Sequence, residues 1–141
     1  MTQEDKELLL KDLCARLPYD VMVNVEGYDT EKLIGIENET ITTKATPTSY
    51  SDKGEYPIYI VKPYLRQMSS MTEEEKKQYG ELCDEDIRQL TSVPILHPGL
   101  KYKTSCHRSI IWLLENHFDF MGLIPKDLAI EVTEDNNPYK E

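Results

Sequence analysis

A leucine-striped segment followed by alternating valines is the feature that most constrains the fold of this chain. An apolar stripe with three- and four-residue spacing predicts a helix over residues 3–17, which Pro18 ends. The stripe comprises Leu9, Leu10, Leu13, Cys14 and Leu17, with Arg16 among the polar residues opposite. Residues 21–25 then carry a valine at every second position, the period of a strand with one buried face. We therefore expect the helix to cover the apolar face of a small sheet.

Three further segments have the β-branched or aliphatic content of strands, at residues 32–37, 40–45 and 56–62. A tight turn is predicted at residues 37–39, between the first two, and a polar loop at 46–55, before the third. Pro57 and Pro63 confine the third strand to a sheet edge or to strand ends, because proline donates no ladder hydrogen bond.

Four short strands joined by short turns and preceded by a helix predict an α+β fold. We expect a small, strongly bent antiparallel sheet or a barrel of the SH3-like or Sm-like type, with the N-terminal helix over one open end. An open meander with the helix on one face is the main competing architecture, and the sequence does not separate the two.

The second half of the chain is predicted to hold two helices and a short closing strand. Thr72 and Glu75 form a capping box that starts the first helix. The apolar stripe of this helix comprises Tyr79, Leu82, Cys83, Ile87 and Leu90. Residues 105–117 form the second, which is apolar nearly all round and is expected to be buried on more than one side. Gly122 is expected to supply a left-handed conformation in the following turn, and alternating apolar residues over 128–132 predict the strand.

Length and composition favour a single domain. The chain has 141 residues, 39% of them hydrophobic, enough for one sizeable core but not for two. We divide it into a helix-plus-β unit over residues 1–66, a helical elaboration over 67–133 and a frayed polar tail over 134–141. Without a signal-like start or an apolar run of spanning length, a soluble cytoplasmic domain with no membrane contact is expected.

The charge of the chain argues against nucleic acid as its main partner. The formal net charge is -10, and so acidic a chain repels phosphate backbones on average. Residues 91–114 are the one basic segment, with Lys101, Lys103 and Arg108 and no acid. We expect this segment to pair with the acidic segments that flank it, and the acids at 84–86 to form a solvated helix face.

No constellation of residues supports catalysis, a metal or a cofactor. Cys14, Cys83 and Cys106 are odd in number and widely spaced, which favours reduced thiols. His107 and His117, on one predicted helix, diverge by about 80° around its axis, too far to share a metal ion. Cys106 lies beside His107 near a helix start, where a thiol pKa can be lowered, but no base or oxyanion site accompanies the pair, so a plain cysteine in the capping region is expected. A non-enzymatic protein without a cofactor is therefore expected.

Tyrosine usage is the one unusual feature of the composition, with nine Tyr against two Phe and one Trp. Tyrosine combines apolar area with a polar tip and is enriched where surfaces bind other proteins. Tyr56, Tyr59 and Tyr64 cluster along the chain, and Tyr28 follows the first strand. These four are the candidate binding residues, on a surface suited to an extended peptide. The alternative is that they pack across the rim of the sheet with their hydroxyls in water.

Two stretches of the chain, residues 62–75 and 112–131, together with the opening helix and its exit at 17–19, resemble a family of short uncharacterised proteins. The family comes from gut bacteria of the Bacteroides group and their phages. The resemblance implies an origin in a mobile element or a commensal genome, and no established activity. The chain has Asn-His at 116–117 where members often have a His pair, and Met121 where they often have Arg. Any site built on those residues is expected to be damaged in this chain.

A non-enzymatic protein-interaction module fits these observations best, and two alternatives stay open. A Sm-like nucleic-acid-associated module would use the basic segment at 91–114 and would bind more weakly as salt rises. An acidic inhibitor that mimics the charge of DNA would present the acids of 73–86 and 115–135 on one face.

Overall fold

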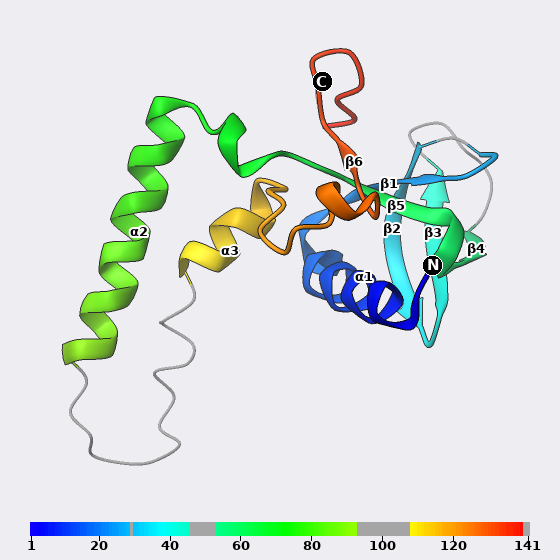
Figure 1. Cartoon of the computed structure of the whole chain (residues 1–141), viewed down its shortest axis with the longest axis horizontal. Helices are drawn as coiled ribbons and strands as arrows, with labels where there is room; N and C mark the ends of the chain where they lie inside the picture. The colour runs from blue at the N-terminus through cyan, green and yellow to red at the C-terminus, as the bar shows by residue number, and fades with distance from the viewer. Residues whose placement is uncertain (29, 46–52, 93–107, 140–141) are drawn as a thin grey trace.

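The chain forms an α+β fold in which one helix covers an open sheet and two further helices extend to one side (Figure 1). The computed structural model describes residues 1–28, 30–45, 53–92 and 108–139. The helices are α1 (Gln3–Arg16), α2 (Glu73–Ser92) and α3 (Arg108–Glu115). The strands are β1 (Met22–Val25), β2 (Thr30–Glu37), β3 (Thr40–Ala45), β4 (Lys53–Pro57), β5 (Val61–Leu65) and β6 (Ile130–Glu131). Short 3-10 turns lie at Leu17–Tyr19, Ile58–Ile60, Met68–Ser70 and Ile124–Lys126.

The six strands form a mixed sheet in the order β4-β3-β2-β1-β5-β6. The first four form an antiparallel meander, β5 pairs antiparallel with the outer side of β1, and β6 pairs parallel with β5. Because β4 and β6 lie at opposite edges, the sheet does not close. The expectation of an SH3-like or Sm-like barrel is therefore not met, and the open alternative describes the architecture.

The strand predicted over residues 56–62 is instead divided between two strands that lie far apart in the sheet. β4 ends at Pro57, the 3-10 turn Ile58–Ile60 follows, and β5 begins at Val61. Pro57 lies at the end of an edge strand, as predicted, because it has no N–H for a ladder, but the same prediction is wrong for Pro63, which lies in the middle of β5, between β1 and β6. The Ile58 N–H donates a hydrogen bond to the carbonyl of Glu39 at 2.9 Å. The chain then leaves the sheet edge and crosses to pair with β1.

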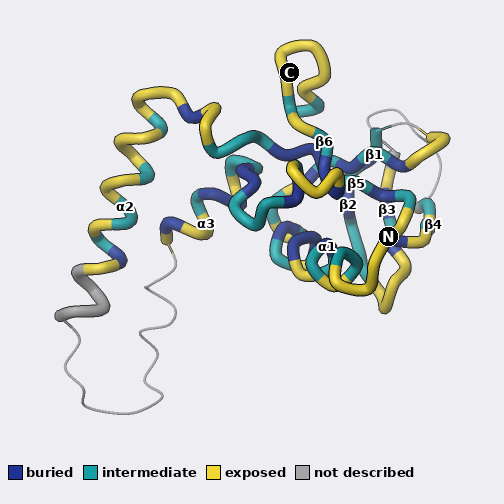
Figure 2. Tube along the Cα trace, viewed as in Figure 1, coloured by how far each residue is buried: buried dark blue, intermediate teal, exposed yellow. Residues whose placement is uncertain are grey.

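The core lies between α1 and the sheet, as the leucine stripe and the alternating valines predict. Leu9 and Leu13 are fully buried against Val23, Leu33 and Ile41 in one apolar cluster. Burying a side chain of this size contributes about 1.5–3 kcal/mol. Figure 2 shows this burial concentrated around α1 and the central strands, whereas α2 exposes most of its length. The N-terminal helix therefore secures the sheet.

The buried face of α1 is rotated from the face that its leucines suggest. Asp12 and Arg16 are fully buried, while Cys14 is exposed. Arg16 Nε donates to Asp12 Oδ2 at 2.7 Å, and its Nη2 donates to the carbonyl of Phe118, also at 2.7 Å. The pairing offsets part of the cost of burying these two charges, while Asp12 Oδ1 and Arg16 Nη1 are buried without a hydrogen-bond partner.

The helical half differs from its prediction mainly in burial. α3 ends at Glu115 rather than 117, and residues 105–107 of the predicted helix lie outside the described part. Ile87 is 57% exposed, and Ile110 and Ile111 are each exposed by more than a third, so neither helix is buried on several sides. Gly122 adopts the left-handed conformation that the sequence predicts, with φ +77°.

Residues 134–139, which we expected to fray, return to the sheet. The Tyr139 hydroxyl accepts from Met22 N at 3.0 Å and donates to the carbonyl of Tyr64 at 2.8 Å. Predicted strand 128–132 is present as the two-residue β6. In the described part of the chain, no helix has both the length and the apolar character needed to span a membrane.

Candidate functional site

The start of α2 is held by a reciprocal capping box and by an ion pair to the sheet. Thr72 Oγ1 accepts from Glu75 N at 3.1 Å, and Glu75 Oε1 accepts from Thr72 N at 3.0 Å, as predicted. The same carboxylate accepts two hydrogen bonds from Arg66, which directly follows β5. These hydrogen bonds from Arg66 are the main cause that lowers the pKa of Glu75 to about 2. The direction of α2 is thus tied to the end of β5.

The start of α3 is capped by a carboxylate from α2. Asp86 accepts from Ser109 N at 3.0 Å, from Ser109 Oγ at 2.6 Å and from Arg108 N at 3.3 Å. Asp86 is only 6% exposed, which corrects its assignment to a solvated face. An anion at a helix N-terminus satisfies the free N–H groups and the helix dipole together. This contact fixes the separation of the two helices.

Three aromatic rings connect the two helices to the segment that follows α3. Trp112 stacks on Tyr79 with centroids 5.7 Å apart and on Phe118 with centroids 5.6 Å apart. The Arg66 guanidinium lies 4.1 Å from the Phe118 centroid. Phe118 is fully buried in a second apolar cluster with Leu113. The ring stack therefore gives the α2–α3 pair a rigid inner side.

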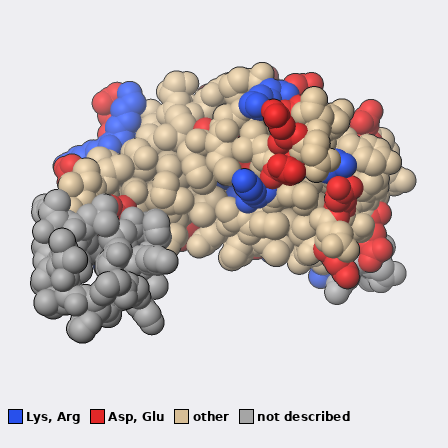
Figure 3. Space-filling model, turned by 60° about the horizontal axis from the view of Figure 1, so that its bottom comes forward, with Lys and Arg blue, Asp and Glu red and all other residues tan. Residues whose placement is uncertain are grey.

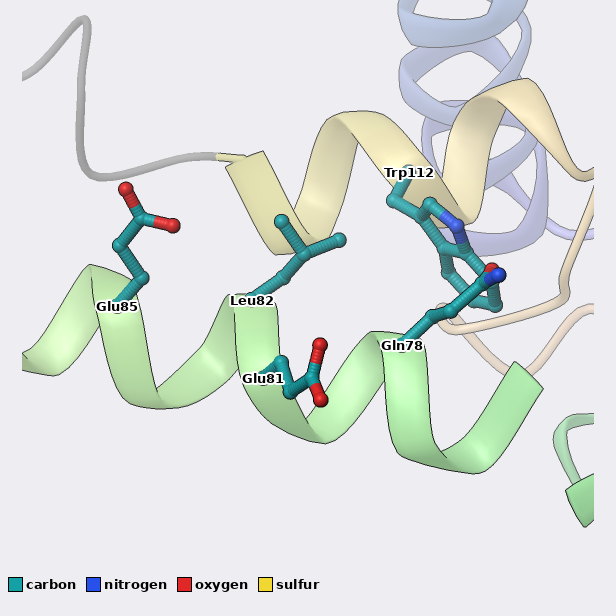
Figure 4. A pocket seen from close by; sticks show the side chains of 5 residues that line it. All are labelled: Gln78, Glu81, Leu82, Glu85 and Trp112. Carbon is teal, nitrogen blue, oxygen red and sulfur yellow. The ribbon is translucent and has the colours of Figure 1, made fainter. Parts of the chain in front are cut away.

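A groove lies between α2 and α3 on the outer side of this stack. It has a volume of about 320 Å³ and is lined by Gln78, Glu81, Leu82, Glu85 and Trp112. Figure 4 shows Leu82 and Glu85 projecting from α2 toward α3, with the amide end of Gln78 beside the Trp112 indole. The groove thus has an apolar wall and a polar rim.

The carboxylates of the rim differ in their partners. Glu85 forms an ion pair with Arg108 at 2.7 Å, which confirms for Arg108 the predicted pairing of the basic segment with its acidic neighbour. Lys101 and Lys103 of that segment lie outside the described residues. Glu81 is exposed, and no Lys or Arg of the described ranges pairs with it. Such a wall and carboxylate suit an aliphatic stem that ends in a cation.

The structure separates the four tyrosines that the sequence singles out. Tyr28 and Tyr56 contact each other with ring centroids 4.9 Å apart, and Tyr28 is 59% exposed. Tyr59 is 64% exposed and lines a different hollow, which includes Lys62. Tyr64 is 8% exposed, and its hydroxyl lies 3.1 Å from Thr30 Oγ1. Two of the four thus lie side by side on the surface, and Tyr64 belongs to the interior.

The histidines and cysteines give no metal site among the residues that the structure describes. No group of three His, Cys, Asp or Glu side chains there is placed to hold a metal ion. His117 lies past the end of α3 in a left-handed conformation, with φ +62°. His97, Cys106 and His107 fall in the segment that is not described.

Comparisons of the chain with protein-family models, with curated proteins and with solved structures found no match. The geometry of the α2–α3 groove is therefore what bears on function. Sequence reasoning placed Leu82 on an apolar stripe but did not identify the groove. The signal was present in Glu81 and Glu85, four residues apart on one helix, and in the single Trp of a neighbouring helix.

Proposed function

We propose that the chain is a non-enzymatic protein-interaction module whose α2–α3 groove receives a Lys or Arg side chain of a partner protein. The observation that carries this proposal is the pairing of an apolar wall, Leu82 and Trp112, with the Glu81 carboxylate at the rim. A Lys or Arg stem buries its methylene groups on such a wall while its charged head remains with the carboxylate. The pairing selects for a cation on a long aliphatic stem.

The net charge of the chain supports a basic partner. The net charge of -10 favours encounter with cationic surfaces through long-range attraction. Figure 3 shows one face on which charged side chains of both signs lie at the α2 end, where Lys and Arg are prominent, and over the opposite half of the molecule, with uncharged side chains between them. The net acidity of the chain, and not the charges on this face, is therefore what favours a basic partner.

The two alternative functions have less support in the described residues. For a nucleic-acid module, Arg108 is already engaged by Glu85. For a DNA-mimicking inhibitor, Glu75 and Asp86 serve as internal partners of Arg66 and of α3. These two acids therefore hold α2 and α3 in place instead of presenting free charge.

Trp112 is the only tryptophan in the sequence, so its fluorescence reports on the groove directly. We expect a short peptide with one central Arg to change the Trp112 emission saturably. The same peptide with citrulline, a neutral isostere of Arg, binds more weakly. Glu81→Gln is expected to lower the affinity for the Arg peptide by about fivefold, since an exposed ion pair contributes up to about 1 kcal/mol. Glu74→Gln, on the same helix but outside the groove lining, leaves the affinity unchanged.

Equal affinity for the Arg and citrulline peptides would contradict the cationic occupant. Loss of affinity in Glu74→Gln as large as in Glu81→Gln would instead indicate attraction by overall charge. The absence of any saturable emission change up to millimolar peptide would contradict the groove as a binding site.

Of the tyrosine surface predicted from the sequence, we keep Tyr28 and Tyr56 as a second contact surface of the same module. Tyr28 and Tyr56 support it because they are in contact and Tyr28 is largely exposed. Double substitution Tyr28→Ala and Tyr56→Ala is expected to weaken binding of a partner first captured through the groove. Tyr59→Ala, an equally exposed tyrosine at a separate hollow, serves as the matched control.

A further inference from the structure

The hydroxyl of Tyr139 occupies a position between two strands where a backbone hydrogen bond would otherwise lie. β1 and β5 are paired as far as Val23 and Pro63, so Met22 and Tyr64 are the next opposed residues. Instead of bonding directly, Met22 N donates to the Tyr139 hydroxyl at 3.0 Å, and the hydroxyl donates to the Tyr64 carbonyl at 2.8 Å. One oxygen thus accepts from one strand and donates to the other.

The ring of Tyr139 stacks on the imidazole ring of His117, which is itself fixed in place. The two ring centroids lie 3.7 Å apart, with an interplanar angle of 8°. His117 is fixed by its own backbone, since its carbonyl accepts from Arg66 N at 2.7 Å and its N–H donates to Leu114 O at 3.2 Å. The His117 ring is therefore held by the folded core, and its position does not depend on the tail.

The segment that carries Tyr139 bonds mainly to itself. Residues 133–137 are exposed. Asn136 accepts from Thr133 N at 2.6 Å and donates to the carbonyl of Glu131 at 3.0 Å, and Asn137 accepts from Tyr139 N at 2.9 Å. Beyond β6, two residues bond to the sheet: Val132 N donates to the Leu65 carbonyl at 2.8 Å, and the Tyr139 hydroxyl bonds to Met22 and Tyr64. A tail held in this way opens at a low free-energy cost relative to the core.

We propose that the slot between β1 and β5, with Met22 N, the Tyr64 carbonyl and the His117 ring, is a binding site for a phenolic side chain that Tyr139 fills as an exchangeable intramolecular ligand. The hydrogen-bonding pattern selects for a hydroxyl, because one atom must both accept and donate. An ionised carboxylate has no hydrogen to donate to the Tyr64 carbonyl, and a plain phenyl ring leaves both backbone groups without a hydrogen bond. This site is independent of the α2–α3 groove.

The test uses the full chain with Tyr139→Ala and follows thermal unfolding and the His117 NMR signals. We expect the variant to fold with reduced stability and p-cresol to stabilise it saturably while shifting the His117 ring signals. Toluene, which has the same shape without the hydroxyl, is expected to bind at least tenfold more weakly. Wild type and Tyr139→Phe are expected to bind p-cresol at the slot much more weakly than Tyr139→Ala, because their own ring must leave the slot before the compound can enter.

Each contrary result overturns the proposal. Equal binding of toluene and p-cresol to Tyr139→Ala would indicate an apolar cavity without selection for a hydroxyl. Failure of Tyr139→Ala to fold even with p-cresol would make Tyr139 a fixed part of the core rather than an exchangeable ligand. Equal binding of p-cresol to Tyr139→Phe would place the compound elsewhere.

Discussion

Arg66 donates two hydrogen bonds, of 2.9 and 2.8 Å, to the carboxylate of Glu75. Arg66 directly follows β5, and Glu75 lies in the first turn of α2, so the pair joins the sheet to the helical half of the chain. The planar guanidinium also lies over the Phe118 ring, which restricts its orientation. The direction in which α2 leaves the sheet therefore depends on a charged pair as well as on apolar packing.

Glu75→Gln is expected to lower the free energy of unfolding by about 1.5–3 kcal/mol at pH 7, the range for a hydrogen bond to a charged group. The folded-state pKa of Glu75 is about 2, below its ordinary 4.5. The ionised carboxylate therefore stabilises the fold fully above pH 4.5, and this contribution is lost as the pH falls toward 2. Urea unfolding between pH 2 and 7 should show a smaller acid loss in Glu75→Gln, with Glu74→Gln matching wild type.

Arg16→Met is expected to destabilise the fold by about 3–5 kcal/mol, because it leaves the buried Asp12 carboxylate without its partner. The double variant Asp12→Leu with Arg16→Met should recover part of this loss. Burial raises the pKa of Asp12 even with Arg16 present. The single variant should thus become more stable as the pH falls, and denaturant titrations at several pH values test this. A double variant less stable than the single one would contradict the account.

Asp86→Ala is expected to cost about 1–2 kcal/mol, since it removes the acceptor for the first N–H groups of α3. Asp84→Ala, an exposed acid two positions earlier, should stay within about 0.5 kcal/mol of wild type. Thermal unfolding measures both. Trp112 emission should also move to longer wavelength in Asp86→Ala, because the helix that carries Trp112 loses its fixed start.

Burial, with a smaller contribution from Arg16, lowers the pKa of His117 from 6.5 to about 4. The folded state therefore binds fewer protons than the unfolded chain between pH 6.5 and 4, and stability falls as the pH drops through that window. His117→Asn, which tolerates the left-handed backbone at this position, should remove this loss. NMR titration of His117 measures the pKa directly, and a value near 6.5 would contradict the expected acid response.

Features set by local chemistry were predictable from the sequence. The Thr72–Glu75 capping box, the turn at Asn38 and the helix over 3–17 each depend on residues within a few positions of one another. The division of residues 56–62 was not predictable, because it depends on which strand the chain meets after Pro57. After Pro57 the chain pairs with β1, a strand that lies much earlier in the sequence.

The same distinction explains why the contacts of Asp86 and Tyr139 were not predicted. Asp86 resembles its solvated neighbour Asp84 in sequence, and only the arrival of α3 makes it a cap. Tyr139 lies in a polar tail whose composition predicts fraying, yet its hydroxyl bonds to two backbone groups of the sheet, Met22 N and the Tyr64 carbonyl. Tertiary contacts of this kind carry no short-range signal.

The place of β1 in the sheet also has a consequence for synthesis. β1 lies between β2, which follows it closely, and β5, which is made only after the whole meander. While the chain is being made, one edge of β1 lacks its β5 partner until that strand has left the ribosome. An open strand edge invites pairing with other chains. The interval before β5 emerges is thus the period in which a nascent chain is most exposed to misassembly.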